Sequence, residues 1–265
     1  MRIAVLGCGN MGRAILEGLE ARHGAAVSLW AYDKRSEATA KISGVEFKKP
    51  EEWLSAESPP EIILVAVKPQ DIDQALQSFQ GMPVAQSLWI SIAAGIPLSR
   101  LRTLLGQSAR IVRAMPNTPA LIGRGVTAYA VGETCTSKDE EHVEMVLGAC
   151  GSVVRVPESL MNAVTGLSGS GPAYVYLFIE GLIEAGVTAG LPYATARELV
   201  VQTVVGAAQM VREGGEAPAE LKARVMSPSG TTVYGLRELE RHALKFSLIE
   251  AVRAAAQRAG ELGCG

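Results

Sequence analysis

Ile3-Ala4-Val5-Leu6 runs directly into Gly7-Cys8-Gly9-Asn10-Met11-Gly12. The four apolar residues are typical of a buried β-strand, and the spacing of the apolar residues that follow predicts a helix over residues 11–22. The six residues between them match the pattern G-x-G-x-x-G in the place where it binds a dinucleotide, after a strand and at the opening of a helix. A plain strand–helix turn is the alternative, and the placement favours the dinucleotide.

The three glycines of this turn have separate expected roles. Gly7 permits the tight turn, Gly9 lets the backbone approach a pyrophosphate, and Gly12 allows the helix to pack closely on the strand. The N-terminus of the helix adds N–H groups and a positive dipole end for the phosphates. We expect the whole turn to contact the cofactor, that is, Gly7, Cys8, Gly9, Asn10, Met11 and Gly12.

Three charged residues, Asp33, Lys34 and Arg35, follow a second predicted strand at 27–32 and bear on the choice of cofactor. An acid at this position accepts a hydrogen bond from the ribose 2′-hydroxyl of NADH, whereas Arg35 suits the 2′-phosphate of NADPH. A solvated turn is a third interpretation. We expect all three residues to bind the cofactor, which is NADPH or NADH, with NADPH favoured.

Further apolar runs predict the other strands of the first half, and a helix is predicted over residues 138–150. The runs are residues 62–67, 88–92, 110–115, 126–131 and 152–156. Strands that alternate with helical segments predict an α/β fold with a Rossmann-like, doubly wound, mostly parallel sheet. The strand ends of such a sheet border a ligand crevice. We expect further cofactor contacts there from Ala66, Val67, Lys68, Pro69, Ala93, Ala94, Gly95 and Asn117.

From about Pro157 the pattern predicts helices alone, over residues 172–189, 193–212, 218–224, 231–241 and 245–262. Residues 158–172 are interpreted as a linker in which Ser170 caps the next helix. The predicted domains are a dinucleotide-binding (Rossmann) domain over 1–157 and an all-helical dimerisation and substrate-binding domain over 158–265. Dimerisation is expected because these apolar, Ala- and Gly-rich helices are hard to cover within one chain.

A second loop that precedes a predicted helix is rich in hydroxyl groups. It reads Ser227-Pro228-Ser229-Gly230-Thr231-Thr232. Its hydroxyls and backbone N–H groups suit a carboxylate without any charged residue. A helix N-cap would explain one of these hydroxyls but not all four.

Composition excludes several kinds of partner. The chain has 25 basic and 27 acidic residues and a formal net charge of −2, which argues against nucleic-acid binding. No uncharged apolar stretch reaches the roughly 18 residues that span a membrane. With three histidines and no C-x-x-C spacing we expect no metal site and the reduced thiols of a cytoplasmic protein. The cysteines are Cys8, Cys135, Cys150 and Cys264.

Over its whole length the chain resembles the pyrroline-5-carboxylate reductases. The resemblance rests on Ala66–Pro69, Arg113–Gly125, Ala163–Tyr174 and Ser227–Thr232. It implies NADPH- or NADH-dependent hydride transfer to the C=N bond of 1-pyrroline-5-carboxylate, which gives L-proline in the last step of proline biosynthesis. It also implies an N-terminal dinucleotide domain, a C-terminal helical dimerisation domain, and dimers that often assemble into decamers.

The resemblance further implies a substrate site. In that family, backbone N–H groups of the loop that is here Ser227–Thr232 hold the substrate carboxylate, and the hydroxyl at Thr232 bonds the ring nitrogen. Thr232 is therefore the expected catalytic residue. The family usually has a glycine where this chain has Ser229. The expected substrate contacts are Glu158, Val225, Ser227, Ser229, Gly230, Thr231 and Thr232.

Two other functions compete with this one. A two-domain dehydrogenase of the β-hydroxyacid type would carry a catalytic lysine on the long helix after the linker, but the chain has no lysine between Gly171 and Gly190. A non-catalytic NAD(P)-binding regulator would bind the dinucleotide without reducing an imine. The hydroxyl-rich loop argues against this alternative, because a sensor needs no site for a carboxylate.

Overall fold

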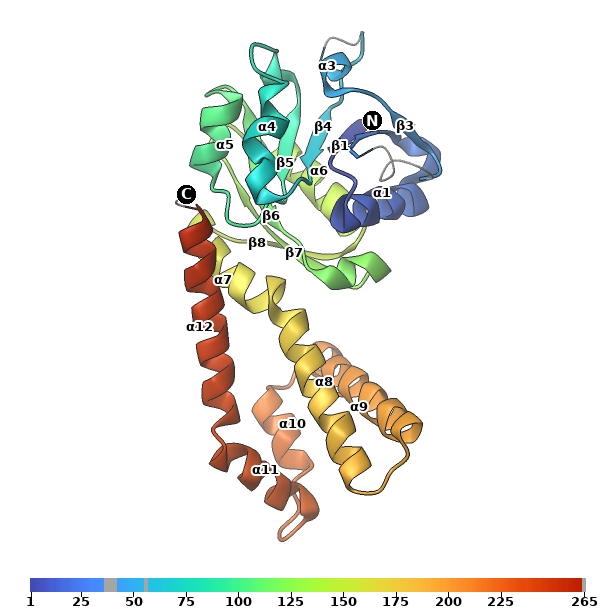
Figure 1. Cartoon of the computed structure of the whole chain (residues 1–265), viewed down its shortest axis with the longest axis vertical. Coiled ribbons are helices and arrows are strands. Elements are labelled where there is room, and N and C mark those ends of the chain that lie inside the picture. The colour runs from blue at the N-terminus through green and yellow to red at the C-terminus, as the bar shows by residue number, and fades with distance from the viewer. Residues whose placement is uncertain (36–41, 55–56, 264–265) are drawn as a thin grey trace. The chain divides into compact units, whose positions relative to one another are not determined.

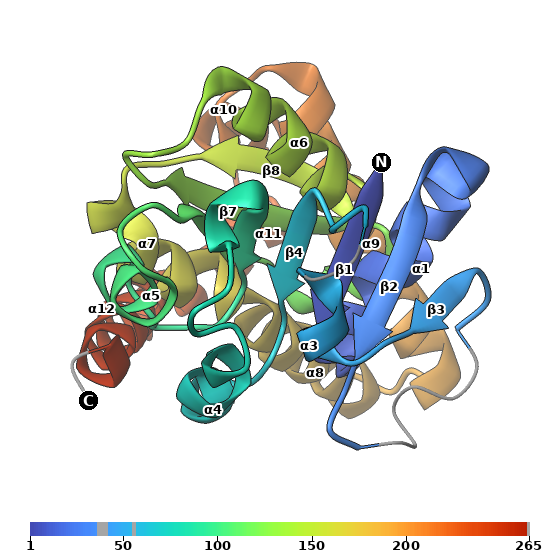
Figure 2. The same ribbon diagram turned by 90° about the horizontal axis from the view of Figure 1, so that it is seen from above.

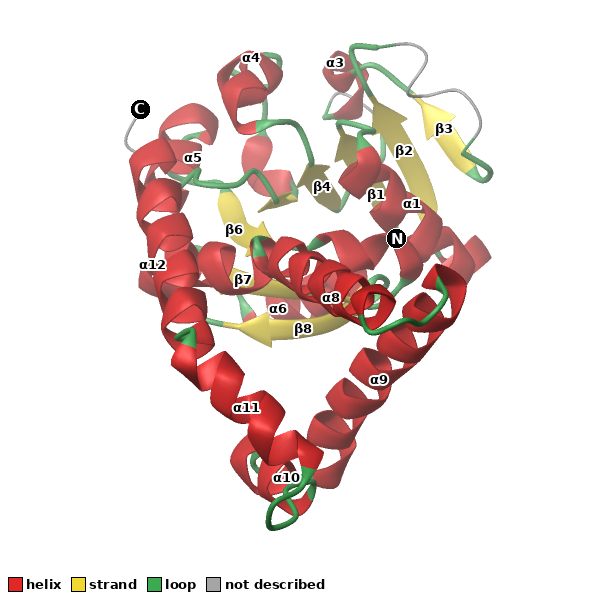
Figure 3. Cartoon of the chain, turned by 60° about the horizontal axis from the view of Figure 1, so that its bottom comes forward, coloured by secondary structure: helices red, strands yellow, loops and turns green. Residues whose placement is uncertain are grey.

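The computed structural model describes residues 1–35, 42–54 and 57–263. The chain forms two compact units, the first made of Met1–Ser170 with Arg253–Gly265 and the second of Gly171–Val252. Figure 1 colours the chain from blue at the N-terminus to red at the C-terminus. The first unit carries the sheet, and every element in the described part of the second unit is a helix, as the colouring in Figure 3 shows.

The first unit is built on a sheet of eight strands in the order β3-β2-β1-β4-β5-β6-β7-β8. Neighbours run parallel except β6 and β7, which are antiparallel. This confirms the predicted mostly parallel sheet. The strand bounds are β1 (Arg2–Leu6), β2 (Ser28–Tyr32), β3 (Val45–Phe47), β4 (Ile62–Val65), β5 (Leu88–Ser91), β6 (Arg110–Met115), β7 (Gly125–Val131) and β8 (Gly151–Arg155).

Helices cover both faces of this sheet (Figure 2). They are α1 (Asn10–His23), α3 (Pro50–Trp53), α4 (Ile72–Gln77), α5 (Leu98–Leu105) and α6 (Ser137–Gly148), with 3₁₀ turns η1 (Gly24–Ala26), η2 (Pro69–Asp71), η3 (Val84–Gln86), η4 (Thr118–Ile122) and η5 (Glu158–Leu160). Alternate side chains of β1 enter opposite layers. Ile3 shares a buried cluster with Leu16 of α1, whereas Ala4 shares another with Leu76 of α4 and Leu101 of α5. Continuous apolar strands follow from this burial on both faces.

The segment before the second unit differs from the expected linker. Its elements are η5, α7 (Met161–Val164), a π-helical turn η6 (Thr165–Gly169) and α8 (Gly171–Thr188). The prediction that Ser170 caps the long helix is wrong, because Ser170 itself has helical dihedral angles and its N–H donates to the Thr165 carbonyl at 2.9 Å. The glycines and serines that suggested a break instead accommodate a wider helical turn, and residues 158–170 belong to the first compact unit.

The second unit contains α8, α9 (Tyr193–Gly214), α10 (Pro218–Arg224), α11 (Thr231–Arg241) and the first residues of α12 (Leu244–Gly263). Helices α8 and α9 pack closely, since a Cβ added at Gly186 would lie 3.0 Å from the Cβ of Ala196. Within these two helices only Ile183 and Ala196 are buried, whereas large apolar side chains such as Leu177 are exposed. No helix among the described residues is long and apolar enough to cross a membrane.

Candidate active site

In the glycine turn between β1 and α1, Gly9 has open space where a side chain would lie, whereas Gly7 and Gly12 are closed off by backbone atoms. Gly7 has φ +101°, and a Cβ there would lie 2.8 Å from the carbonyl carbon of Ala66 at the end of β4. A Cβ at Gly12 would lie 2.0 Å from the Gly7 carbonyl oxygen. No described atom lies within 4 Å of a Cβ added at Gly9, and no described side chain caps α1. The backbone at Gly9 is thus the part of the turn that a bound group can approach.

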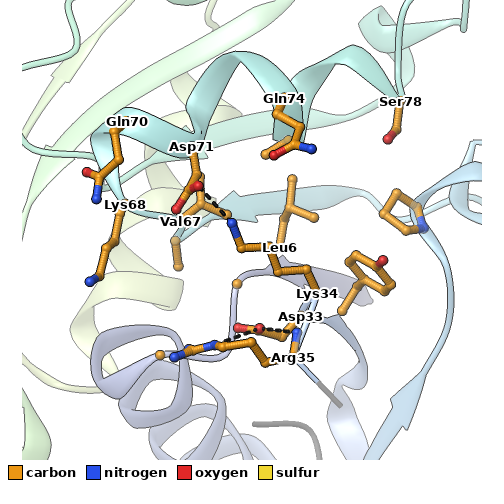
Figure 4. Close-up of a pocket in the computed structure, with 16 residues that line it drawn as sticks. Leu6, Asp33, Lys34, Arg35, Val67, Lys68, Gln70, Asp71, Gln74 and Ser78 are labelled. Atoms are coloured by element: carbon orange, nitrogen blue, oxygen red, sulfur yellow. Dashed lines mark hydrogen bonds and ion pairs between the residues drawn. The ribbon is translucent and has the colours of Figure 1, made fainter. Parts of the chain in front are cut away.

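A cavity of about 470 Å³ lies beside this turn, at the carboxyl ends of β1, β2 and β4 (Figure 4). Eight of its lining residues are among the predicted cofactor contacts, namely Gly7, Gly9, Asp33, Lys34, Arg35, Ala66, Val67 and Lys68. The other wall comes from η2, α4 and the residue that follows α4. No lining residue of this wall was predicted from the sequence, and three further lining positions were missed. The missed residues are Leu6, Tyr32, Pro50, Gln70, Asp71, Gln74, Ala75 and Ser78.

Asp33 ties the end of β2 to the glycine turn. Its Oδ2 accepts the backbone N–H of Cys8 at 2.8 Å. Its Oδ1 accepts the backbone N–H of Arg35 at 2.9 Å and the Arg35 Nε at 3.3 Å. Burial alone would raise the pKa of this carboxyl, but the hydrogen bonds from Arg35 and Cys8 outweigh burial and hold the pKa below its usual value. Asp33 is therefore a charged cap on the turn.

Lys34 reaches across the cavity to the opposite wall. Its Nζ lies 2.8 Å from Oδ1 of Asp71 in η2, and the dashed line in Figure 4 marks this pair. The Lys34 side chain is largely exposed and that of Asp71 about a third exposed. The part of the cavity next to the end of β2 therefore contains two ion pairs, Asp33–Arg35 and Lys34–Asp71.

Five other predicted cofactor contacts lie outside the cavity lining, namely Cys8, Asn10, Met11 and Gly12 of the turn and Pro69 after β4. Cys8 is buried, and burial, followed by the charge of Asp33, raises the pKa of its thiol to about 12. Asn10 and Met11 open α1, and Pro69 opens η2. Gly12 is buried against Gly7.

The predicted contacts at the ends of β5 and β6 are also placed elsewhere. A Cβ on Gly95 would lie 3.3 Å from the Cβ of Leu262, so the segment Ala93-Ala94-Gly95 lies under the end of α12. The Oδ1 of Asn117 accepts the backbone N–H of Val126 at 3.0 Å and closes the connection from β6 to β7. The structure does not bring either segment to the cavity beside the glycine turn.

Glu158 takes part in a partly buried polar cluster. Its Oε1 accepts the backbone N–H of Leu98, at the start of α5, at 2.6 Å and lies 3.4 Å from Nη1 of Arg113. Arg113 is buried and also donates to Oδ1 of Asn162 at 3.3 Å. Burial lowers the pKa of the Arg113 guanidinium, and the charge of Glu158 opposes this shift. Glu158 therefore caps a helix and neutralises a buried cation within the first unit.

The hydroxyl-rich loop opens α11 in the second unit. The Gly230 N–H donates to the Ser227 carbonyl at 2.9 Å, and a Cβ at Gly230 would lie 2.2 Å from Ser227 Oγ. Ser229 occupies the left-handed region with φ 59°. Val225, Ser227, Ser229 and Thr231 are exposed, and Thr232 is half-buried in the first turn of α11. The loop is thus a short, accessible turn with its hydroxyls at a helix start.

The glycine turn fits a dinucleotide, because the space beside Gly9 is open while Gly7 and Gly12 are closed, and a cavity with charged side chains continues from the turn. A Rossmann-like sheet with such a turn defines a dinucleotide-binding protein. The family model for NADP oxidoreductase, coenzyme F420-dependent, matches residues 2–95, and that for pyrroline-5-carboxylate reductase dimerisation matches residues 158–262. The chain belongs to the pyrroline-5-carboxylate reductase family and associates with itself as a dimer.

Individual relatives agree with this assignment. A pyrroline-5-carboxylate reductase of Synechocystis is 48% identical over 203 residues, which is 77% of this chain and 75% of the relative. The structure of one from Coxiella burnetii has a TM-score of 0.90 at 33% identity and covers 98% of this chain and 97% of its own. That of a Plasmodium falciparum pyrroline carboxylate reductase with NADP bound has a TM-score of 0.88 at 32% identity and covers 99% and 98%.

Proposed function

We propose how this chain carries out the reaction of its family, the NADPH- or NADH-dependent reduction of 1-pyrroline-5-carboxylate to L-proline, which is the last step of proline biosynthesis. The observation that carries the proposal is the pairing of an open Gly9, set between two closed glycines, with a cavity at the strand ends that is lined by charged side chains. It supports a dinucleotide site in the first unit, while the loop at Ser227–Thr232 supports a carboxylate site in the second.

The cofactor is held by its phosphates and its ribose. The N–H groups at the start of α1 bind the pyrophosphate beside Gly9, because no described side chain competes for them there. Arg35, Lys34 and Lys68 supply positive charge along the cavity. When bound, the cofactor supplies a hydride to the carbon of the C=N bond.

The substrate is held by the loop that opens α11. Backbone and hydroxyl groups of residues 227–231 bind its carboxylate, with Val225 beside them. Thr232 points its hydroxyl at the ring nitrogen, orients it and relays to it a proton taken up from solvent. Positioning carries most of the catalysis, because a protonated imine is already electrophilic and needs mainly alignment in a dry site. Glu158, which the structure engages with Arg113 and α5, supports the substrate site as a positioning residue.

The proposed domains follow these roles, with dinucleotide binding over 1–157 and dimerisation and substrate binding over 158–265. The start of the dimerisation model at residue 158 and the exposed apolar faces of α8 and α9 support this division. A decamer, as five dimers, and a cytoplasmic location complete the proposal. The described cysteines Cys8, Cys135 and Cys150 are unpaired, which suits a reducing compartment.

Replacing Thr232 tests the substrate site. We expect Thr232→Ala to lower turnover with pyrroline-5-carboxylate by at least about tenfold, because one oriented hydrogen bond to the nitrogen is lost. The dissociation constant for NADPH, measured by fluorescence titration, should change by less than about twofold, because Thr232 is not among the residues proposed to hold the phosphates and ribose of the cofactor. Thr232→Ser keeps the hydroxyl and is expected to restore most of the turnover. Equal turnover in Thr232→Ala and the parent would refute the role.

A further inference from the structure

The cavity contains, next to the end of β2, the groups that can distinguish NADPH from NADH. The two cofactors differ only by a phosphate on the adenosine ribose, and the end of the second strand is where such a sheet receives that ribose. Asp33, Lys34, Arg35 and Asp71 all line this part of the cavity. The inference below rests on the cofactor site proposed above.

Asp33 has little capacity left for a ribose hydroxyl. A carboxylate offers about four acceptor positions, and Asp33 already uses three of them for Cys8 N, Arg35 N and Arg35 Nε. Its side chain is only 7% exposed. The acid that would favour NADH is therefore committed to holding the turn, and its charge is balanced by Arg35.

Asp71 is placed to oppose a 2′-phosphate. Its carboxylate lies 2.8 Å from the ammonium group of Lys34, which reaches over from the opposite wall of the cavity (Figure 4). An anion that approaches Lys34 must compete with this carboxylate and also meets its negative charge. Nothing comparable acts on a ribose that carries a neutral hydroxyl. Removing the charge of Asp71 therefore has opposite consequences from removing that of Lys34.

We propose that Asp71, through its ion pair with Lys34, limits the preference of this chain for NADPH over NADH. Asp71 is a specificity-determining residue that the sequence motifs do not include. It lies in η2, just before α4, whereas the predicted specificity residues follow β2. Asp71 acts through Lys34, because it pairs with the ammonium group that would otherwise bind the 2′-phosphate.

Titration calorimetry with two cofactor fragments tests this proposal without turnover. The fragments are 2′,5′-ADP, which carries the 2′-phosphate, and 5′-ADP, which lacks it. We expect Asp71→Asn to raise the affinity for 2′,5′-ADP by about fivefold, which is the size expected of a partly exposed ion pair. The affinity for 5′-ADP should change by less than about twofold. Lys34→Met should weaken 2′,5′-ADP by a similar factor, and in that background Asp71→Asn should have a clearly smaller effect.

Asp73 offers a matched control on the neighbouring helix. It lies two positions further along, in α4, and pairs with Arg100 outside the cavity lining. At the same ionic strength, Asp73→Asn should leave the affinity ratio of the two fragments unchanged, which separates the local pair from a general change in charge. An equal shift for both fragments in Asp71→Asn, or the same shift in Asp73→Asn, overturns the inference alone. Failure of the parent to bind either fragment overturns the cofactor site and the inference together.

Discussion

Two loops in this chain open a helix and contain glycine, and they are held in different ways. The turn at Gly7–Gly12 is closed by distant parts of the chain, because Gly7 abuts Ala66, which directly follows β4, and Asp33 caps the N–H of Cys8. The loop at Ser227–Thr232 is held by hydrogen bonds within itself and the start of α11, such as Gly230 N–H to the Ser227 carbonyl. Its left-handed position is filled by a serine, Ser229.

This difference shows when a glycine can be replaced. A left-handed backbone angle costs an ordinary residue about 1–2 kcal/mol, which a protein tolerates. A Cβ driven into a neighbouring backbone atom cannot be relieved in that way, because the neighbour is itself fixed by the sheet. The first turn is therefore restricted by packing and the second mainly by backbone conformation.

The largest expected effect comes from Gly12→Ala. The new Cβ would lie 2.0 Å from the Gly7 carbonyl oxygen, so α1 must move away from the sheet. We expect a loss of about 3 kcal/mol in the free energy of unfolding, measured with urea. Gly9→Ala is the matched control, since its Cβ has open space; it should leave stability nearly unchanged and weaken NADPH binding. Similar stability in both variants would contradict the packing argument.

A smaller effect is expected when the cap of the same turn is neutralised. Asp33→Asn should cost about 1 kcal/mol at pH 7, because charge-assisted hydrogen bonds become neutral ones. The folded state lowers the pKa of Asp33, so its contribution is complete above the unfolded pKa of about 4 and disappears as the pH falls through the lower folded pKa. Urea unfolding of both proteins across this range should show their stabilities converging only in acid. A difference that does not depend on pH would exclude the charge as its cause.

The smallest effect is expected in the second loop. Ser229→Gly removes the strain of φ 59° but adds flexibility to the unfolded chain, so we expect a net gain of about 0.5 kcal/mol in the free energy of unfolding. Ser247→Gly, inside α12 where φ is negative, is the control and should lose about 1 kcal/mol. Thermal unfolding of the two variants gives the comparison directly. A loss of stability in Ser229→Gly would show that the serine makes a contact of its own.

Most of the fold could be predicted from periodicity. A long apolar run such as residues 62–67 follows from burial on both faces of a strand. The helical spacing of apolar residues in α1 follows from burial of one stripe. Strand β3, Val45-Glu46-Phe47, is too short to show a pattern. The π-helical turn η6 was missed because its glycines and serines are also the residues of a linker.

The candidate site divides in the same way. The glycine turn and the residues after β2 and β4 could be found from spacing, since their positions follow from the strands that carry them. Asp71, Gln74 and Ser78 could not be found, because exposed polar residues on a helix resemble an ordinary solvated face until the fold turns them toward a cavity. Gly95 shows the converse, since Leu262 at the end of α12 lies beside a strand end where the sequence predicts a cofactor contact.

The cysteine inside the dinucleotide turn has a consequence for chemical resistance. Because the pKa of Cys8 is raised to about 12, its sulfur stays protonated at neutral pH. A thiolate in this place would repel the diphosphate and would be the form that alkylating agents and peroxides attack. The same burial that keeps negative charge away from the phosphates therefore protects the residue from oxidative damage.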